Sequence, residues 1–262
     1  MTAARILMLA AIAAVLALGS VWQPFDPEAI DIAAALAPPG SRHWLGTDHL
    51  GRDILSRILV GGWRTLTVLA AVAALSFALG AVIGTSAALI GGGVAELLMR
   101  FAEFLAVLPS LVVALVITAI IGFTPATAGL ALAIGHAGPF ALMAYGLARR
   151  TVAEPYIEAA RLLHIGRPRL VLRHILPNCW PTLAAYVAAD LGRNVVGYAG
   201  LAFLGLGGAI SSPDWGSMLY EYRSHLFDAP SLMLWPGAAI AVTATVLNLT
   251  LDPTVADTDD TA

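Results

Sequence analysis

The sequence predicts an all-α integral membrane protein with about six transmembrane helices. Hydrophobic residues make up 59% of the 262-residue chain and charged residues only 12%, whereas soluble domains carry roughly 25% charged residues. The mean hydropathy of +0.82 leaves too few polar groups to cover a surface in water. Most of the chain is therefore expected to contact lipid or another apolar helix.

Six apolar stretches approach the length of roughly 20 residues that a helix needs to cross a bilayer. The expected spans are residues 6–22, 66–90, 104–121, 126–148, 181–204 and 231–251. Few charges interrupt them: Asp190 and Arg193 lie within the fifth span, and Glu103 lies at the edge of the third. The first stretch also fits a cleaved signal peptide, but the apolar stretches that follow favour a retained helix.

The chain is expected to have four consecutive parts. Residues 1–22 form the first transmembrane helix, and residues 23–63 form an external loop that contains an amphipathic helix. Residues 64–251 form a five-helix transmembrane core, which includes a cytoplasmic loop at residues 149–177. Residues 252–262 form an acidic tail.

Arginine placement predicts the orientation, because cytoplasmic loops are enriched in positive charge. Residues 149–173 hold six of the 14 basic residues and only two acidic ones. Residues 23–63 hold three arginines against five acidic residues. The first of these segments is therefore expected in the cytoplasm together with both termini, and the second is expected outside.

Composition also excludes several classes of function. The formal net charge of -3 argues against nucleic-acid binding, which needs a concentrated basic face. The single cysteine, Cys179, excludes an internal disulfide and a cysteine-rich metal site. The sequence has no Gly-x-x-x-x-Gly-Lys-Ser/Thr pattern, so no nucleotide site is expected on this chain.

The external segment before the second span is expected to contain an amphipathic helix at the membrane surface. Thr47 or Asp48 can cap its N-terminus, and Asp53 and Arg57 can pair four residues apart on one face. The helix either anchors the protein or closes the outer mouth and contacts a soluble partner. The candidate residues for an external gate or a partner contact are Asp48, Arg52, Asp53 and Arg57.

The cytoplasmic loop is expected to form a helix, a break and a second short helix. Pro155 suits the first turn of the helix, and Gly166 and Pro168 break it. Glu158 and Arg161 are expected to pair beside an apolar stripe. That stripe consists of Tyr156, Ala159, Ala160 and Leu163. The loop either inserts into a groove of a partner or forms a solvated hairpin at the membrane interface.

Three motifs resemble those of ABC importer permeases. Glu158-Ala159-Ala160, followed by Leu176-Pro177, resembles the EAA loop of these permeases. Residues 45–53, and residues 203–207 together with Trp215-Gly216, resemble the second permease of the peptide/nickel class. The resemblance covers nearly the whole chain.

The resemblance implies the type I ABC importer permease fold, in the bacterial inner membrane, with a cytoplasmic EAA coupling helix. It implies a heterodimer with a homologous permease, two cytoplasmic ATPase subunits that hold ATP and Mg²⁺, and a periplasmic or lipoprotein substrate-binding protein. This chain would bind no cofactor and no metal and would act by alternating access. The residues implied to couple to the ATPase are Glu158, Ala159, Ala160, Arg161, His164 and Gly166.

Three features depart from the pattern of the family. His164 stands where the EAA motif normally has glycine, so the helix is expected to turn one step later, near Gly166. Tyr198 stands where peptide permeases often have an acidic residue. The stretch before Asp252-Pro253 lacks the short Gly-Asp-x-Leu-Arg sequence.

The sequences of residues 43–53 and 199–207 resemble those of nickel permeases slightly more than those of peptide permeases. Import of nickel or a metal chelate is therefore the expected function, with dipeptide or oligopeptide import as the alternative. His136 and Met143 share a face of the fourth span and either line a soft-metal path or fill the core. Asp190 and Arg193 either pair with each other or contact the substrate. A membrane-embedded enzyme is a remote alternative, because no catalytic motif is recognisable.

Overall fold

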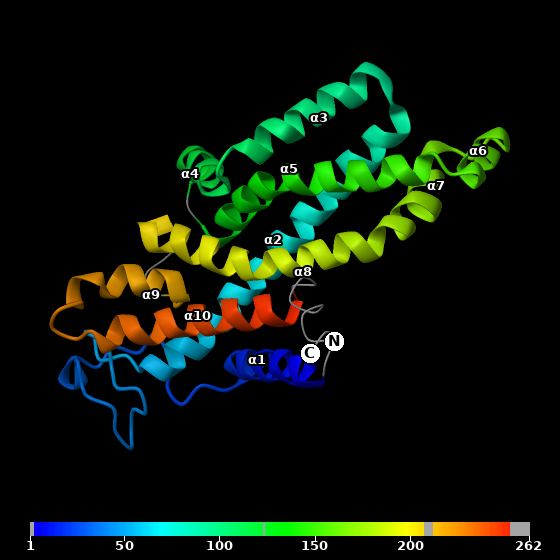
Figure 1. The fold of residues 1–262 in the computed structure, drawn as a ribbon. Helices are drawn as coiled ribbons and strands as arrows, with labels where there is room; N and C mark the ends of the chain where they lie inside the picture. Colours follow the sequence, from blue (N-terminus) through cyan, green and yellow to red (C-terminus); the bar gives the residue numbers. More distant parts are fainter. Residues whose placement is uncertain (1–2, 123, 207–211, 252–262) are drawn as a thin grey trace, which may run out of the picture. The chain divides into compact units, whose positions relative to one another are not determined.

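The computed structural model describes residues 3–122, 124–206 and 212–251, and every structural statement below concerns these residues. They are almost entirely helical, apart from loops and one isolated antiparallel bridge between Thr47 and Asp53. The long helices in Figure 1 are α1 (Ala3–Val21), α2 (Ile54–Ile90), α3 (Gly92–Val107), α4 (Ser110–Ile121), α5 (Pro125–Val152), α8 (Leu176–Leu201) and α10 (Ser231–Leu251). The short helices are α6 (Pro155–Leu162), α7 (Arg167–Leu170) and α9 (Trp215–Tyr222), with single turns at Ile32–Ala34, Val171–Ile175, Ala202–Leu206 and Arg223–His225.

Helices occupy all six predicted spans. Among the described residues, α2, α5 and α10 each have the length and composition to cross a membrane on their own. The pair of α3 and α4 passes the same test together, and α1 contributes a shorter apolar helix. The fifth span corresponds to the 26-residue helix α8. The prediction of an all-helical membrane protein is thus confirmed.

The third predicted span is wrong as a single straight helix. Helix α3 ends at Val107, α4 begins at Ser110, and their axes differ by 97°. Pro109 explains the break, because proline disfavours the helical conformation of the preceding residue. Leu108 accordingly has φ -74° and ψ 133°, an extended conformation.

The amphipathic helix predicted near residues 47–57 also differs from the structure. The helix begins only at Ile54 and continues without interruption as α2. Its N-terminal cap is Asp53, whose carboxylate accepts hydrogen bonds from the backbone N–H of Ser56 at 2.8 Å and from its hydroxyl at 2.7 Å. Gly46 and Gly51 have φ values of 82° and 77°, so the residues before Asp53 form turns rather than helix.

The described chain divides into two compact units. One unit contains residues Met1–Ala70, Ile121–Gly129 and Ala189–Ala262, and the other contains Ala71–Ile120 and Leu130–Ala188. Each unit has its own packing, described separately below.

In the second unit, small residues let α3 and α5 approach closely. A Cβ atom on Gly138 would lie 2.6 Å from the carbonyl oxygen of Ala102, so only glycine fits there. Around this contact, Ala95, Met99 and Ala141 are buried in one apolar cluster. Close packing through small residues is the usual means of helix association where lipid supplies no hydrophobic driving force.

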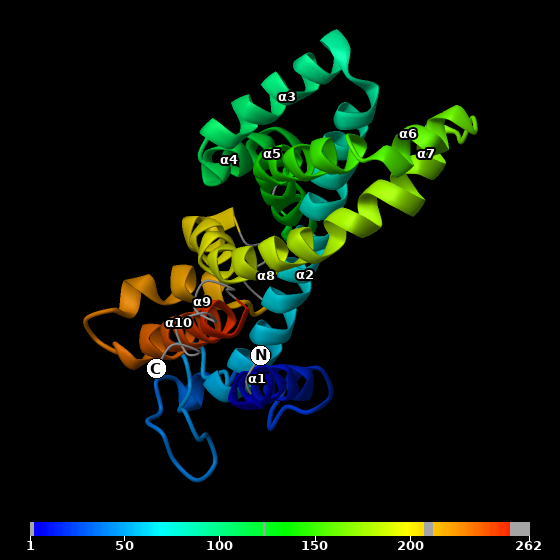
Figure 2. The same ribbon diagram turned by 45° about the vertical axis from the view of Figure 1, so that its right-hand side comes forward.

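In the first unit, α9 packs against α10 and against the end of α8 (Figures 1 and 2). A Cβ atom on Gly216 would lie 2.6 Å from the carbonyl oxygen of Ala199. The indole Nε1 of Trp215 donates a hydrogen bond of 2.9 Å to the carbonyl oxygen of Ile58 on α2. Gly205 has φ 88° and turns the chain after α8. Residues 203–206 and the Trp215-Gly216 segment therefore hold this corner of the unit together. The last glycine of the Phe-Leu-Gly-Leu-Gly segment, at position 207, lies outside the described residues, as do residues 208–211.

Candidate functional site

Helix α6 and the turn that follows it lie at one end of α5 and α8 within the second unit (Figures 1 and 2). Pro155 opens the helix at its first turn, as the sequence predicts. Ile157 is fully buried and Ala160 is 6% exposed. Both contribute to an apolar cluster with Leu170 and Ile175 from the return of the chain to α8. The helix is therefore seated on its own unit by one face only.

The C-terminal end of α6 carries two leucine side chains that the described residues leave largely uncovered. Leu162, the last residue of the helix, and Leu163, its C-cap, are 75% and 76% exposed. Tyr156 is 45% exposed, and its ring and hydroxyl contact His174 and Asn178. A group of large apolar side chains at such exposure marks an interaction surface. Glu158 and Arg161, which also lie on α6, are exposed as well.

The predicted apolar stripe on α6 is only partly correct. Ala160 points into the cluster together with Ile157, which the stripe did not include, whereas Ala159 and Leu163 are exposed. The described residues show no ion pair between Glu158 and Arg161. Both charged groups are thus available to a partner.

The sequence predicts that the turn after α6 lies near Gly166, but in the structure the turn lies at His164. His164 has φ 57°, in the left-handed region, whereas Gly166 has φ -60°. The N–H of Ile165 donates to the carbonyl of Ala160 at 3.1 Å, and the N–H of His164 donates to that of Arg161 at 2.9 Å. These two bonds define a Schellman motif, in which glycine normally occupies the left-handed position. The position keeps its conformation although the glycine is missing.

His164→Gly is expected to stabilise the turn by about 1 kcal/mol, because a residue with a side chain is strained in the left-handed region and glycine is not. Thermal unfolding of the purified protein in detergent measures the effect. Gly166→Ala serves as the matched control and is expected to be nearly neutral, because Gly166 has a negative φ and no atom within 4 Å of an added Cβ. A lower melting temperature for His164→Gly would contradict this account.

In the first unit, four charged side chains form a buried network. Arg52 donates through Nε to Asp48 Oδ2 at 2.6 Å and also contacts Glu221 through Nη2. Arg57 donates through Nη2 to Glu221 Oε2 at 2.9 Å, and its Nε lies 3.7 Å from Asp48 Oδ2. The hydroxyl of Tyr222 donates to Asp48 Oδ2 at 3.2 Å. Two guanidinium groups thus face two carboxylates, so the network is electrically balanced.

This network corrects the pairing that was predicted in the external segment. Arg57 pairs with Glu221 and not with Asp53, whose carboxylate instead caps α2 and accepts from His43 Nδ1 at 2.9 Å. The candidate residues for an external gate or a partner contact are all buried, at most 3% exposed, and that role stays a prediction. Glu221 was missed, because it lies more than 160 residues away along the chain. Its only signal in the sequence is an acidic residue between Tyr220 and Tyr222.

Asp48, His49 and Glu221 are close enough together to hold a metal ion. Their charge is already compensated, because Arg52 and Arg57 bind the same two carboxylates. A divalent cation there would meet two guanidinium groups at contact distance, which argues against a metal site. Burial lowers the pKa of His49, so its ring is neutral at neutral pH.

The predicted pair within the fifth span is present. Arg193 donates to Asp190 Oδ1 through Nε at 3.2 Å and through Nη2 at 3.1 Å. Asn194 donates through Nδ2 to Asp190 Oδ2 at 2.8 Å, a partner that the sequence analysis did not include. His136 lies half-buried on α5, in the other unit.

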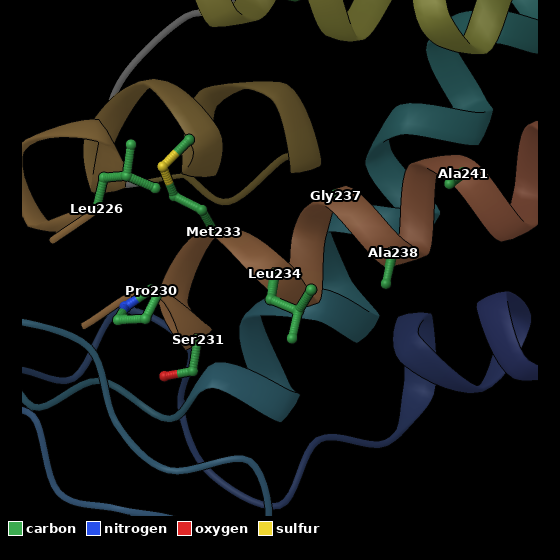
Figure 3. Close-up of a pocket in the computed structure, with 8 residues that line it drawn as sticks. All are labelled: Leu226, Pro230, Ser231, Met233, Leu234, Gly237, Ala238 and Ala241. Atoms are coloured by element: carbon green, nitrogen blue, oxygen red, sulfur yellow. The ribbon is translucent and has the colours of Figure 1, made fainter.

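An apolar groove of about 690 Å³ lies along α10. Figure 3 shows its lining side chains, which include Met233, Leu234 and Ala238 on α10 and Leu226 before it. Ser231 supplies the only side-chain polar group among the lining residues. The groove suits an apolar occupant and offers little to a polar substrate.

Comparison with known protein families identifies the class of this protein. Residues 76–253 match the family described as "Binding-protein-dependent transport system inner membrane component". This chain belongs to that family. The permease is therefore a membrane component of an ABC importer, in which separate ATPase subunits use ATP, and it is not itself an enzyme.

Several relatives of the permease are named for the substrate that they transport. The nickel transport system permease protein NikC of Escherichia coli K12 is 34% identical over 94% of this chain and 89% of its own length. The probable D,D-dipeptide transport system permease protein DdpC of the same strain is 35% identical, over 86% of this chain and 75% of its own. The glutathione transport system permease protein GsiD of Pectobacterium atrosepticum gives the same three values.

The permease also shares its fold with a solved transporter. A chain of the MetNI methionine ABC transporter, in inward-facing conformations, matches with a TM-score of 0.57 over 77% of this chain and 95% of that chain. At 17% sequence identity, this likeness concerns the fold alone. It agrees with the type I fold that the resemblance implied.

Proposed function

We propose that this permease carries nickel, free or as a metal chelate, across the inner membrane by alternating access. The observation that supports nickel best is the match to NikC, which extends over 94% of this chain and 89% of the relative. The permease forms one half of a heterodimer with a homologous permease. Two ATPase subunits bind it from the cytoplasm, and a periplasmic or lipoprotein binding protein delivers the substrate.

The exposed face of α6 supports the assignment of the ATPase contact. It presents Leu162 and Leu163, both about three-quarters exposed, while Ile157 and Ala160 fix the helix to its own unit. A helix seated on one face and open on the other can pass a displacement of a partner to α5 and α8. With this loop in the cytoplasm, both termini lie there too, and residues 23–63 lie outside.

Import of dipeptides or oligopeptides is the second candidate function. Its support is the similarity to the D,D-dipeptide and glutathione permeases, each 35% identical over 86% of this chain. These relatives match a smaller share of their own length than NikC does.

Reconstitution of the complete transporter in proteoliposomes tests the substrate. ATP-dependent accumulation of ⁶³Ni²⁺, added free or as its citrate chelate, is expected, and a radiolabelled dipeptide is the competing substrate. Uptake of the dipeptide without uptake of either form of nickel would refute the nickel proposal and support the second candidate.

Glu158→Lys is expected to abolish coupled transport while leaving the permease in the membrane. The carboxylate of Glu158 is exposed in the first turn of α6, where a partner can reach it. Its negative charge also interacts favourably with the positive end of the helix dipole. ATP-dependent uptake and the binding of the ATPase subunits to the permease are measured together. The matched control is Glu154→Lys, because Glu154 is exposed just before α6 and forms no side-chain cap bond. If Glu158→Lys transports like the control, Glu158 has no coupling role.

A further inference from the structure

An exposed guanidinium group lies in the middle of the fifth predicted span. Arg193 is near the centre of the fifth predicted span, residues 181–204, and within α8. At 1.5 Å per residue, either end of that span is more than about 15 Å away along the helix. Arginine side chains reach the membrane interface only from positions near helix ends. The fifth predicted span therefore places the charge of Arg193 far from both membrane interfaces.

The environment of Arg193 is asymmetric. Its side chain is 63% exposed, whereas that of Asp190 is 8% exposed. The guanidinium donates from Nε and from Nη2 to the same oxygen, Asp190 Oδ1. Asn194 holds the other oxygen of Asp190. Asp190 is thus a buried anchor that fixes the guanidinium with its outer side open.

The same face of α8 continues without cover toward the end of the helix. Val196 is 56% exposed, and no described atom lies within 4 Å of a Cβ built on Gly197 or Gly200. These positions follow Arg193 at helical spacing, so they share its face. The residues on this face beyond Arg193 have small side chains or none, and Arg193 provides its one positive charge.

Lipid is an unfavourable neighbour for such a face, because a charged group in the bilayer centre is costly and marks a substrate pathway or a paired interior. We propose that Arg193 lines a hydrated translocation path and binds a carboxylate of the passing substrate. This proposal rests on the proposed function and adds a substrate class to it. Guanidinium binds carboxylate with directed, charge-assisted hydrogen bonds. A carboxylate chelate of nickel and the terminal carboxylate of a peptide both satisfy this chemistry, whereas bare Ni²⁺ does not.

Variants of Arg193 in the reconstituted transporter test the proposal. Uptake of ⁶³Ni²⁺ citrate and of a radiolabelled dipeptide is measured, so that the two sources of the carboxylate are distinguished. Arg193→Gln is expected to lower uptake of the carried substrate about tenfold or more, as the loss of a charge-assisted hydrogen bond does. Arg193→Lys is expected to retain part of the uptake, because it keeps the charge.

Two further variants separate ligand binding from structural pairing. The double variant Asp190→Asn/Arg193→Gln removes both charges. If the pair had only a structural role, this variant would avoid the uncompensated carboxylate that Arg193→Gln leaves at Asp190, and uptake would recover. We expect its uptake to remain low; recovery to the wild-type rate would overturn the proposal. Arg100→Gln is the control, since Arg100 also pairs on its own helix, with Glu96, at an exposed site, and it is expected to transport normally. Equal uptake by Arg193→Gln and the wild type would also overturn the proposal, while leaving nickel or peptide import intact.

Thiol labelling gives a readout that does not need transport. The only cysteine, Cys179, is buried and can be replaced by serine. In that background, Arg193→Cys is expected to react with the water-soluble anionic reagent sulfonatoethyl methanethiosulfonate in the assembled transporter. Leu183→Cys, at a fully buried position of the same helix, is expected not to react. An unreactive Arg193→Cys would overturn the proposal even if the transporter carried neither probe.

Discussion

Glu221→Leu is expected to destabilise the folded permease by about 3–5 kcal/mol, the usual cost of removing one partner from a buried ion network. Its carboxylate contacts Arg52 and accepts from Arg57 at 2.9 Å, and its side chain is only 7% exposed. Without it, one carboxylate, Asp48, remains for two buried guanidinium groups. At about 2–4 °C per kcal/mol for a chain of this size, the melting temperature is expected to fall by about 10 °C.

Thermal unfolding in detergent measures this effect against a matched control. Glu96→Leu removes an acidic partner of an arginine at an exposed site, where Glu96 and Arg100 are 64% and 72% exposed. Exposed pairs contribute about 0–1 kcal/mol, so the control is expected to be nearly neutral. The double variant Glu221→Leu/Arg52→Met removes one charge of each sign and is expected to recover much of the loss. Equal melting temperatures for Glu221→Leu and Glu96→Leu would show that the network contributes little.

The same network shows why the sequence predicted the helices better than their contacts. Apolar length alone located helices at all six predicted spans, because the bilayer imposes a fixed requirement on the length of each helix. The prediction for Arg57 used the residue four positions away, Asp53, whereas the structure pairs it with Glu221 on α9. Spacing rules describe neighbours on one helix and carry no information on residues that folding brings together.

Two local errors have opposite causes, a signal that the prediction overlooked and a signal that the sequence lacks. Pro109 breaks the third span, and a proline in an apolar stretch is a recognised helix boundary. At His164 the reverse happens: the sequence lacks the glycine that marks the turn, yet the chain turns there with φ 57°. The Schellman bonds and the burial of Ile157 and Ala160 fix the geometry and impose the strain on His164. Tertiary packing has overridden a local preference at this position.

The candidate site was predictable in its position but not in its orientation. The arginine-rich loop, Pro155 and the Glu-Ala-Ala motif located α6 to within the residues found. Which face of an eight-residue helix is buried depends on the return of the chain through Leu170 and Ile175, and no periodicity in so short a segment determines that. The structure therefore adds the identity of the open face.

Replacing Leu162 and Leu163 together with serine is expected to weaken binding of the ATPase subunits about 100-fold without unfolding the permease. Burial of a leucine side chain contributes about 1.5–3 kcal/mol, so partial burial of two against a partner amounts to about 3 kcal/mol, or roughly two powers of ten in affinity. Because both side chains are about three-quarters exposed in the permease, their loss is expected to change its own stability by less than about 0.5 kcal/mol.

The measurement is the affinity of purified ATPase subunits for the assembled permease pair in detergent, with the melting temperature recorded in parallel. Leu172→Ser is the matched control, because Leu172 is 65% exposed in the same hairpin but lies outside α6. If Leu172→Ser weakens binding as much as the double variant, the docking surface extends over the hairpin and is not confined to α6. If neither variant weakens binding, the exposed leucines serve another contact and the ATPase binds elsewhere on the permease. If only the double variant loses affinity, and its melting temperature is unchanged, docking is assigned to Leu162 and Leu163 at the end of α6. The two leucines then contribute to binding of the ATPase and not to the stability of the permease.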